Sequence, residues 1–71
     1  MQRMQASMDR LQEKYVGKTI RINNMVGEPQ YTGKTGVVEF VDGECQLHGT
    51  WGGLAVQLEH DSISIIEKEN N

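Results

Sequence analysis

Several features that commonly stabilise a small protein are scarce in this sequence. The chain of 71 residues has a single cysteine, Cys45, so no disulfide can form within it. Cys45 and the two histidines, His48 and His60, are fewer than the four ligands that a structural zinc site of the usual spacing needs. A domain near this size buries only about 60% of the surface of its unfolded chain. We therefore expect no metal, and expect support from a packed helix or a second chain.

Long apolar runs and nucleotide-binding glycine motifs are also absent. No apolar segment approaches the roughly 18 residues of a membrane helix, and no stretch resembles a signal peptide, so we expect a cytoplasmic protein. Neither the Walker phosphate loop nor the dinucleotide-binding motif occurs. Alternation places Cys45 on an inward-facing register, where a thiol is inert. The sequence therefore predicts no enzyme activity and no cofactor.

Basic residues are nearly absent from the second half of the chain. Residues 1–36 hold six basic and three acidic side chains, whereas residues 37–71 hold one lysine and seven acidic side chains. Phosphate contacts supply most nonspecific affinity for DNA and RNA, so the acidic half argues against general nucleic-acid binding. The predicted acidic surface consists of Glu39, Asp42, Glu44, Glu59 and Asp61.

Apolar residues at helical spacing predict one amphipathic helix over residues 1–16. The spacings of three and four residues form the a/d pattern of a heptad repeat. Because so short a helix is marginal alone in water, this face has to be covered. Two interpretations stay open: the helix packs on its own sheet, or it joins two copies in a homodimer. The residues of this face are Met1, Met4, Met8, Leu11 and Tyr15.

From residue 17 to residue 67 the pattern changes to the period of two that is typical of strands. Apolar side chains alternate in residues 19–22, 45–51, 54–58 and 63–65. Residues 36–41 are apolar on both faces apart from Glu39, which favours a central strand. The pairs Asp42-Gly43 and Gly52-Gly53 predict tight hairpins.

Five short strands, with one long loop at residues 23–34, predict the fold class. We expect a mainly β protein with one N-terminal helix, in which residues 17–67 form a small five-stranded SH3-like antiparallel barrel. Residues 68–71 are expected to form a disordered tail.

Aromatic and flexible residues outside the obvious core positions suggest a binding cleft. If the loop with Tyr31 adjoins the turn after Trp51, the two aromatic rings edge a cleft that suits a peptide, a nucleotide or a protein loop. Trp51 shares its strand face with Leu47, so a place in the core is the alternative for this residue. The predicted binding residues are Arg21, Tyr31, His48, Trp51, Gly52 and Gly53.

Three segments carry a resemblance to known proteins. They are residues 17–25, 27–42 and 46–55, and the run from His48 to Leu54, His-Gly-Thr-Trp-Gly-Gly-Leu, is the most specific. They resemble a family of small proteins of unknown function, found mainly in phages and mobile elements of Gram-positive bacteria. The run Gly-Lys-Thr-Gly-Val-Val from Gly33 to Val38 also resembles the KOW motif of ribosome-associated and transcription-associated barrels.

Two hypotheses for the function follow. In the first, the chain is a phage or mobile-element accessory protein that blocks a host defence component, as anti-CRISPR and other anti-defence proteins do. It acts in the host cytoplasm, through its acidic surface or by sequestering a small nucleotide near Tyr31, Trp51 and Arg21. In the second, it is a KOW-like nucleic-acid-binding module that acts through Lys18, Arg21 and Lys34. The acidic half favours the first, with a host protein or a small nucleotide as partner.

Overall fold

The structure, a computed structural model, describes residues 2–66, and describes side chains from residue 8 onward. Within this range the chain forms one α-helix, five strands and one short 3-10 helix, so the predicted class, mainly β with one N-terminal helix, is confirmed. The expected tail at 68–71 lies outside the described residues. The elements are α1 (Gln2–Tyr15), β1 (Thr19–Asn24), η1 (Pro29–Tyr31), β2 (Thr35–Val41), β3 (Gln46–Gly49), β4 (Val56–Gln57) and β5 (Ser62–Ile65).

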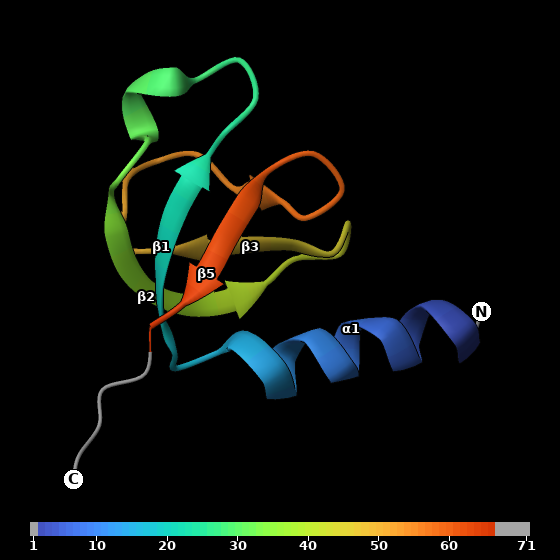
Figure 1. Ribbon diagram of the computed structural model, residues 1–71. Coiled ribbons are helices and arrows are strands. Elements are labelled where there is room, and N and C mark those ends of the chain that lie inside the picture. Colours follow the sequence, from blue (N-terminus) through green and yellow to red (C-terminus); the bar gives the residue numbers. More distant parts are fainter. Residues whose placement is uncertain (1, 67–71) are drawn as a thin grey trace, which may run out of the picture.

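The strands form one antiparallel sheet in the order β4-β3-β2-β1-β5, with β2 at its centre as predicted. Figure 1 shows how the sheet curls, so that β1 and β5 run steeply across β3. Strand β2 takes part in both halves, because it pairs with β1 at its start and with β3 at its end. Strands β4 and β5 are the two edges of this sheet.

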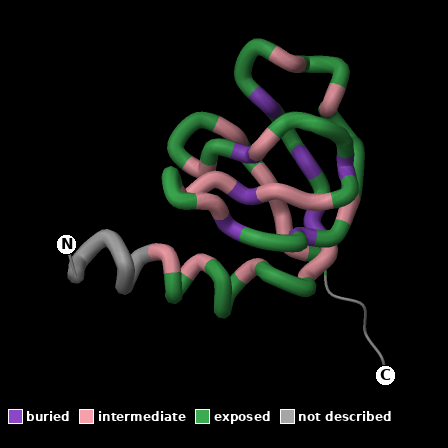
Figure 2. The backbone as a smooth tube through the Cα atoms, turned by 180° about the vertical axis from the view of Figure 1, so that it is seen from behind, coloured by how far each residue is buried: buried purple, intermediate pink, exposed green. Residues whose placement is uncertain are grey.

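The core lies inside the curl of the sheet (Figure 2). Strand β1 contributes Ile20 and Ile22, both fully buried, as the alternation predicts. Met25 is buried as well, although it lies in the long loop predicted at residues 23–34, where no apolar pattern placed it in the core. The buried apolar side chains among the described residues are Ile20, Ile22, Met25, Val38, Val41, Leu47, Trp51 and Val56.

Helix α1 packs on the sheet through its C-terminal half. Leu11 and Tyr15 lie against the core, and the Gly17 N–H donates to the Val38 carbonyl at 2.8 Å. Figure 1 shows that the helix runs away from the sheet toward its N-terminus. Met8 is half-buried, whereas the predicted interface positions Met1 and Met4 lie outside the described side chains. No helix in the described part of the chain has the length and apolar character to cross a membrane.

The turn between β2 and β3 differs from the two-residue hairpin that the Asp42-Gly43 pair predicts. The Cys45 N–H donates to the Asp42 carbonyl at 2.9 Å, and the Asp42 N–H donates to the Gln46 carbonyl at 3.0 Å. Residues 43–45 therefore form a three-residue loop, whose last residue, Cys45, has a φ of 63°. Cys45 thus belongs to a half-buried turn position and not to an inward-facing strand register.

Candidate binding surface

The predicted cleft is present in part, because Tyr31 and Gly52 are adjacent. A Cβ on Gly52 would lie 2.8 Å from the Tyr31 hydroxyl, so the long loop does adjoin the segment after β3. Trp51, however, is only 4% exposed, and its Nε1–H donates to the Leu54 carbonyl at 2.7 Å. Of the two alternatives for Trp51, the core is the one observed, and this ring does not edge a cleft.

Packing and hydrogen bonding around Trp51 explain the Gly-Thr-Trp-Gly run at residues 49–52. A Cβ on Gly49 would overlap the Val37 carbonyl and the Trp51 ring, so only glycine lets the indole lie there. The Thr50 hydroxyl accepts the Val37 N–H at 2.9 Å, and the Thr50 N–H donates to the Val37 carbonyl at 3.1 Å. Residues 50–55 consequently form a longer connection to β4 than the hairpin predicted from Gly52-Gly53.

The remaining predicted binding residues are spread over the surface. Arg21 is exposed on β1, opposite Thr35 on β2 and Ser64 on β5. Gly53 is exposed in the connection between β3 and β4. The Lys34 ammonium lies 5.8 Å from the centroid of the Tyr31 ring. These positions form no single polar pocket around Tyr31.

Two of the predicted acidic residues, Glu59 and Asp61, follow β4, and Asp61 has a structural role. Asp61 accepts the Val26 N–H at 3.0 Å through Oδ1 and the Gln57 N–H at 2.9 Å through Oδ2. It therefore fastens the loop after β1 to the turn after β4, and both of its oxygens are engaged. Glu59 beside it is exposed, 4.0 Å from His60 Nε2. The other three acidic residues lie around the β2–β3 turn.

A residue that the sequence analysis did not single out, Phe40, dominates this second place. Its side chain is 48% exposed. The Phe40 and His48 rings stack almost parallel, with centroids 4.5 Å apart and an interplanar angle of 3°. The two residues are cross-strand partners on β2 and β3, the pairing that brings side chains closest on a sheet face.

A β-bulge explains why Phe40 points outward. Val38 pairs with Gly49 and Phe40 pairs with His48, so β2 advances by two residues where β3 advances by one. The extra residue, Glu39, resets the alternation, and both Val38 and Val41 become buried. The spacing of three between these two valines was the signal in the sequence, since a regular strand cannot bury both.

Asp42 fixes the position of the His48 ring. Its Oδ2 lies 2.7 Å from His48 Nε2, while its Oδ1 accepts the N–H groups of Glu44 at 2.8 Å and Gln46 at 3.0 Å. The hydrogen bond with His48 lowers the pKa of the Asp42 carboxyl most, and the Gln46 amide lowers it further. Burial opposes the shift, and the Glu44 amide again lowers the pKa. One carboxylate thereby orders both the turn and the imidazole.

Among the described residues, Asp42 is the side-chain partner of His48, and no hydroxyl or thiol bonds to its ring as the nucleophile of a triad would. No group of three His, Cys, Asp or Glu within the described part of the chain could hold a metal ion. The arrangement is an exposed aromatic pair ordered by one carboxylate, with the exposed Glu39 next to Phe40 in the chain. We call it the Phe40 surface: Glu39, Phe40, Asp42 and His48.

Comparison with known proteins provides no relative for this chain. No family model, curated protein or solved structure matches it. Any functional proposal therefore depends on the geometry and charge of the surface itself.

Proposed function

We propose that this protein is a non-enzymatic binding protein that docks on a basic protein partner through the Phe40 surface. One observation carries the proposal: Phe40 is half exposed while its ring is stacked on His48, which the Asp42 carboxylate holds, and the exposed Glu39 precedes Phe40 in the chain. An apolar ring is held at the surface by a bulge and a hydrogen-bonded histidine, although burial would stabilise the fold more.

The chemistry of the surface selects a cationic partner. An aromatic face attracts an arginine or lysine side chain through its ring quadrupole, and nearby carboxylates add charge complementarity. Because His48 and Asp42 already hold the ring, little side-chain entropy is lost on binding. Phosphates are repelled by the same carboxylates, which disfavours nucleic acid at this face.

The finer proposal is that the partner is a host defence component and that the chain acts as a phage or mobile-element accessory protein in the host cytoplasm. A defence nuclease holds its nucleic acid in a basic groove, and an acidic protein surface can compete for that groove. Sequestration of a nucleotide has less support, because Trp51 lies in the core and leaves Tyr31 as the one half-buried ring near Gly52.

Affinity capture with matched variants tests the proposal. Tagged wild-type protein, Phe40→Ala and a control, Thr32→Ala, are incubated with an extract of a Gram-positive host, and bound proteins are identified by mass spectrometry. We expect a basic protein that wild type and Thr32→Ala retain and that Phe40→Ala loses. The captured partner, once purified, should bind the wild-type chain at least about tenfold more tightly than it binds Phe40→Ala. This difference corresponds to about 1.4 kcal/mol of binding free energy.

Two results would overturn the proposal. One is an identical set of bound proteins for wild type and Phe40→Ala, with both variants folded as judged by the emission of the single tryptophan, Trp51. The other is a gel shift of short DNA or RNA at low salt that is abolished when Lys18, Arg21 and Lys34 are changed to alanine. That second result would instead identify the KOW-like nucleic-acid-binding module.

A further inference from the structure

The two edge strands of the sheet differ in how far their backbone is already bonded. On β4, which has only two residues, the Gln57 N–H donates to Asp61 Oδ2 at 2.9 Å. The Gln57 carbonyl accepts the His60 N–H at 2.9 Å and the Asp61 N–H at 2.8 Å. Strand β5 (Ser62–Ile65) has four residues without a charge or a proline, the features that commonly protect an edge from pairing. The edge of β5 is therefore the one open to a further strand.

The hydrogen bonds to β1 show which backbone groups of β5 face the open side. The Ile66 N–H donates to the Thr19 carbonyl at 2.8 Å. Because alternate residues of an antiparallel strand bond to the same neighbour, Ser64 also bonds toward β1, and the N–H and C=O groups of Ile63 and Ile65 point away from it. Among the described residues, no backbone bond joins Ile63 or Ile65 to a segment on that side.

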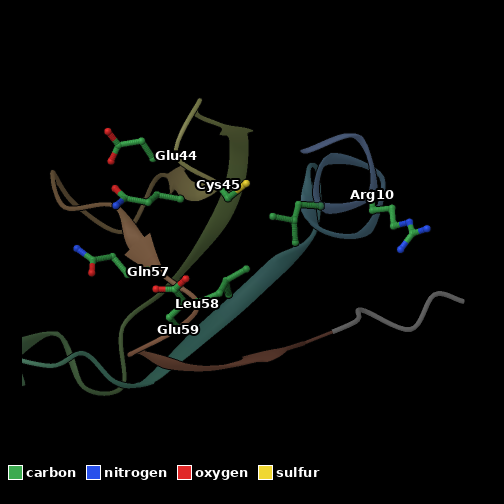
Figure 3. Close-up of a pocket in the computed structure, with 8 residues that line it drawn as sticks. Arg10, Glu44, Cys45, Gln57, Leu58 and Glu59 are labelled. Carbon is green, nitrogen blue, oxygen red and sulfur yellow. The ribbon is translucent and has the colours of Figure 1, made fainter. Parts of the chain in front are cut away.

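The outer edge of β5 is also separate from the main cavity of the domain. Figure 1 shows β1 along one side of β5 and no strand along the other. A cavity of about 440 Å³ lies between α1 and the neighbouring ends of β3 and β4 (Figure 3). Its lining comes from α1, β3, β4 and the turns before β3 and after β4, and includes no residue of β5.

We propose that β5 pairs with β5 of a second copy, antiparallel and centred on Ser64, so that two sheets become continuous in a two-fold dimer. The sequence Ile-Ser-Ile around Ser64 reads the same in both directions, so in this register Ile63 of one copy faces Ile65 of the other. Since the outward backbone groups belong to these two residues, both Ile63–Ile65 pairs exchange N–H···O bonds in each direction. The proposal is independent of the partner proposed for the Phe40 surface.

The side chains of β5 favour another copy of this strand as its partner. Opposite Ser64 the two Cα atoms approach to about 4.5 Å, which suits a second small side chain. Opposite the half-buried Ile63 and Ile65, a branched apolar side chain extends the covered face. Strand β5 meets both conditions itself, and two uncharged strands bring no like charges together. A cationic segment, in contrast, finds no carboxylate on β5 and meets Arg21, which pairs with Ser64.

Disulfide trapping in the full chain tests the register. Ser64→Cys and its matched control, Ser62→Cys, are each combined with Cys45→Ala, so that one thiol per chain remains. In the proposed register the two positions 64 face each other with Cα atoms about 4.5 Å apart, within the range of a disulfide. The two positions 62 lie about 13 Å apart, because each faces position 66 of the other copy. Under the same mild oxidation, Ser64→Cys should form the covalent dimer at least about tenfold faster.

Two measurements without a cross-link complete the test. In sedimentation velocity at several hundred micromolar, wild type is expected at twice the chain mass and Ser64→Lys at the mass of one chain, because two ammonium groups then face each other. Glu44→Lys, which changes charge at the cavity, should leave the dimer intact. Hydrogen exchange at the Ile63 and Ile65 amides should slow as the protein concentration rises, whereas exchange at the Ile20 amide should not change.

Three results would overturn the inference. The first is a wild-type chain that keeps the mass of one chain at this concentration, with exchange at Ile63 and Ile65 independent of concentration. The second is cross-linking of Ser62→Cys as fast as that of Ser64→Cys. The third is a dimer that persists in Ser64→Lys, folded as judged by Trp51 emission, and dissociates in Met4→Lys with Met8→Lys. That third result would assign the interface to the apolar face of the N-terminal helix.

Discussion

The indole of Trp51 lies against the backbone of Gly49, two residues earlier in the chain. A Cβ at position 49 would overlap the Trp51 ring and the Val37 carbonyl at once. Because both neighbours belong to the core or to the strand ladder, neither can move without loss of packing. The glycine is therefore a condition for burying the largest side chain of the domain.

The first prediction concerns this contact. Gly49→Ala should lower the free energy of unfolding by about 3 kcal/mol, because the added methyl displaces the indole or the ladder. Urea unfolding followed by Trp51 emission measures the change. Gly43→Ala serves as the control, since a Cβ there meets nothing within 4 Å. Equal stabilities of the two variants would show that the indole has room to move.

A second prediction follows from the left-handed conformation of Cys45. A side chain at a φ of 63° carries a steric cost that glycine avoids. Cys45→Gly should therefore raise the free energy of unfolding by about 1 kcal/mol, after allowance for the added freedom of the unfolded chain. Cys45→Ala retains the Cβ and should give no gain, so thermal unfolding of the three proteins separates backbone strain from loss of the thiol.

A third prediction concerns acid stability. In the folded state the pKa of Asp42 lies below its ordinary value of 3.8, chiefly because of the hydrogen bond with His48. The stabilisation from this carboxylate is thus fully present above the unfolded pKa and is lost as the pH falls through the folded pKa. Wild type should be more stable than Asp42→Asn at pH 6, and the difference should shrink below pH 3.8.

Denaturant titrations at several pH values check this prediction. The matched control is Glu39→Gln, an exposed carboxylate on β2 three residues before Asp42, whose difference from wild type should be small at every pH. If the Asp42→Asn difference were as large under strongly acidic conditions as at neutral pH, the carboxylate would not be the source of the stability.

A fourth prediction concerns Asp61, which joins two loops. Asp61→Ala removes the acceptor of the Val26 and Gln57 N–H groups and should cost about 2 kcal/mol. Hydrogen exchange at these two amides should quicken more than exchange at core amides such as that of Ile20. Uniform acceleration across the sheet would indicate global destabilisation in place of a local release. Glu59→Ala, two residues earlier in the same turn, is the control for removal of an exposed charge.

The alternation of apolar residues predicted β1, β3 and β5 and most of the core. Strand β2 was predicted from a run that is apolar on both faces, although Val37 and Phe40 of that run are exposed. Ile20 and Ile22 are buried and Arg21 between them is exposed, because β1 is regular over this stretch and one of its faces is covered. The helix was predicted for the same kind of reason, since Leu11 and Tyr15 repeat at helical spacing and pack on the core.

The features that place the candidate binding surface depend on interactions between elements, and were harder to predict. The bulge at Glu39 follows from the requirement that both Val38 and Val41 be buried, which a strict period of two conceals. The Asp42-Gly43 pair is compatible with several turns. The three-residue loop is stabilised by the Asp42 carboxylate, which accepts two backbone amides and bonds to His48. The burial of Met25 depends on tertiary packing that no local pattern encodes.

The bulge on β2 separates exposed residues from core residues within one strand. Glu39 and Phe40 are both exposed opposite a single residue of β3, while their flanking valines hold the interior. Substitutions at positions 39 and 40 can therefore change the chemistry of this exposed face without repacking the domain. Under the proposed function, such substitutions would adapt the strand to a different partner with little loss of stability, which is useful where a binding target changes faster than the protein that binds it.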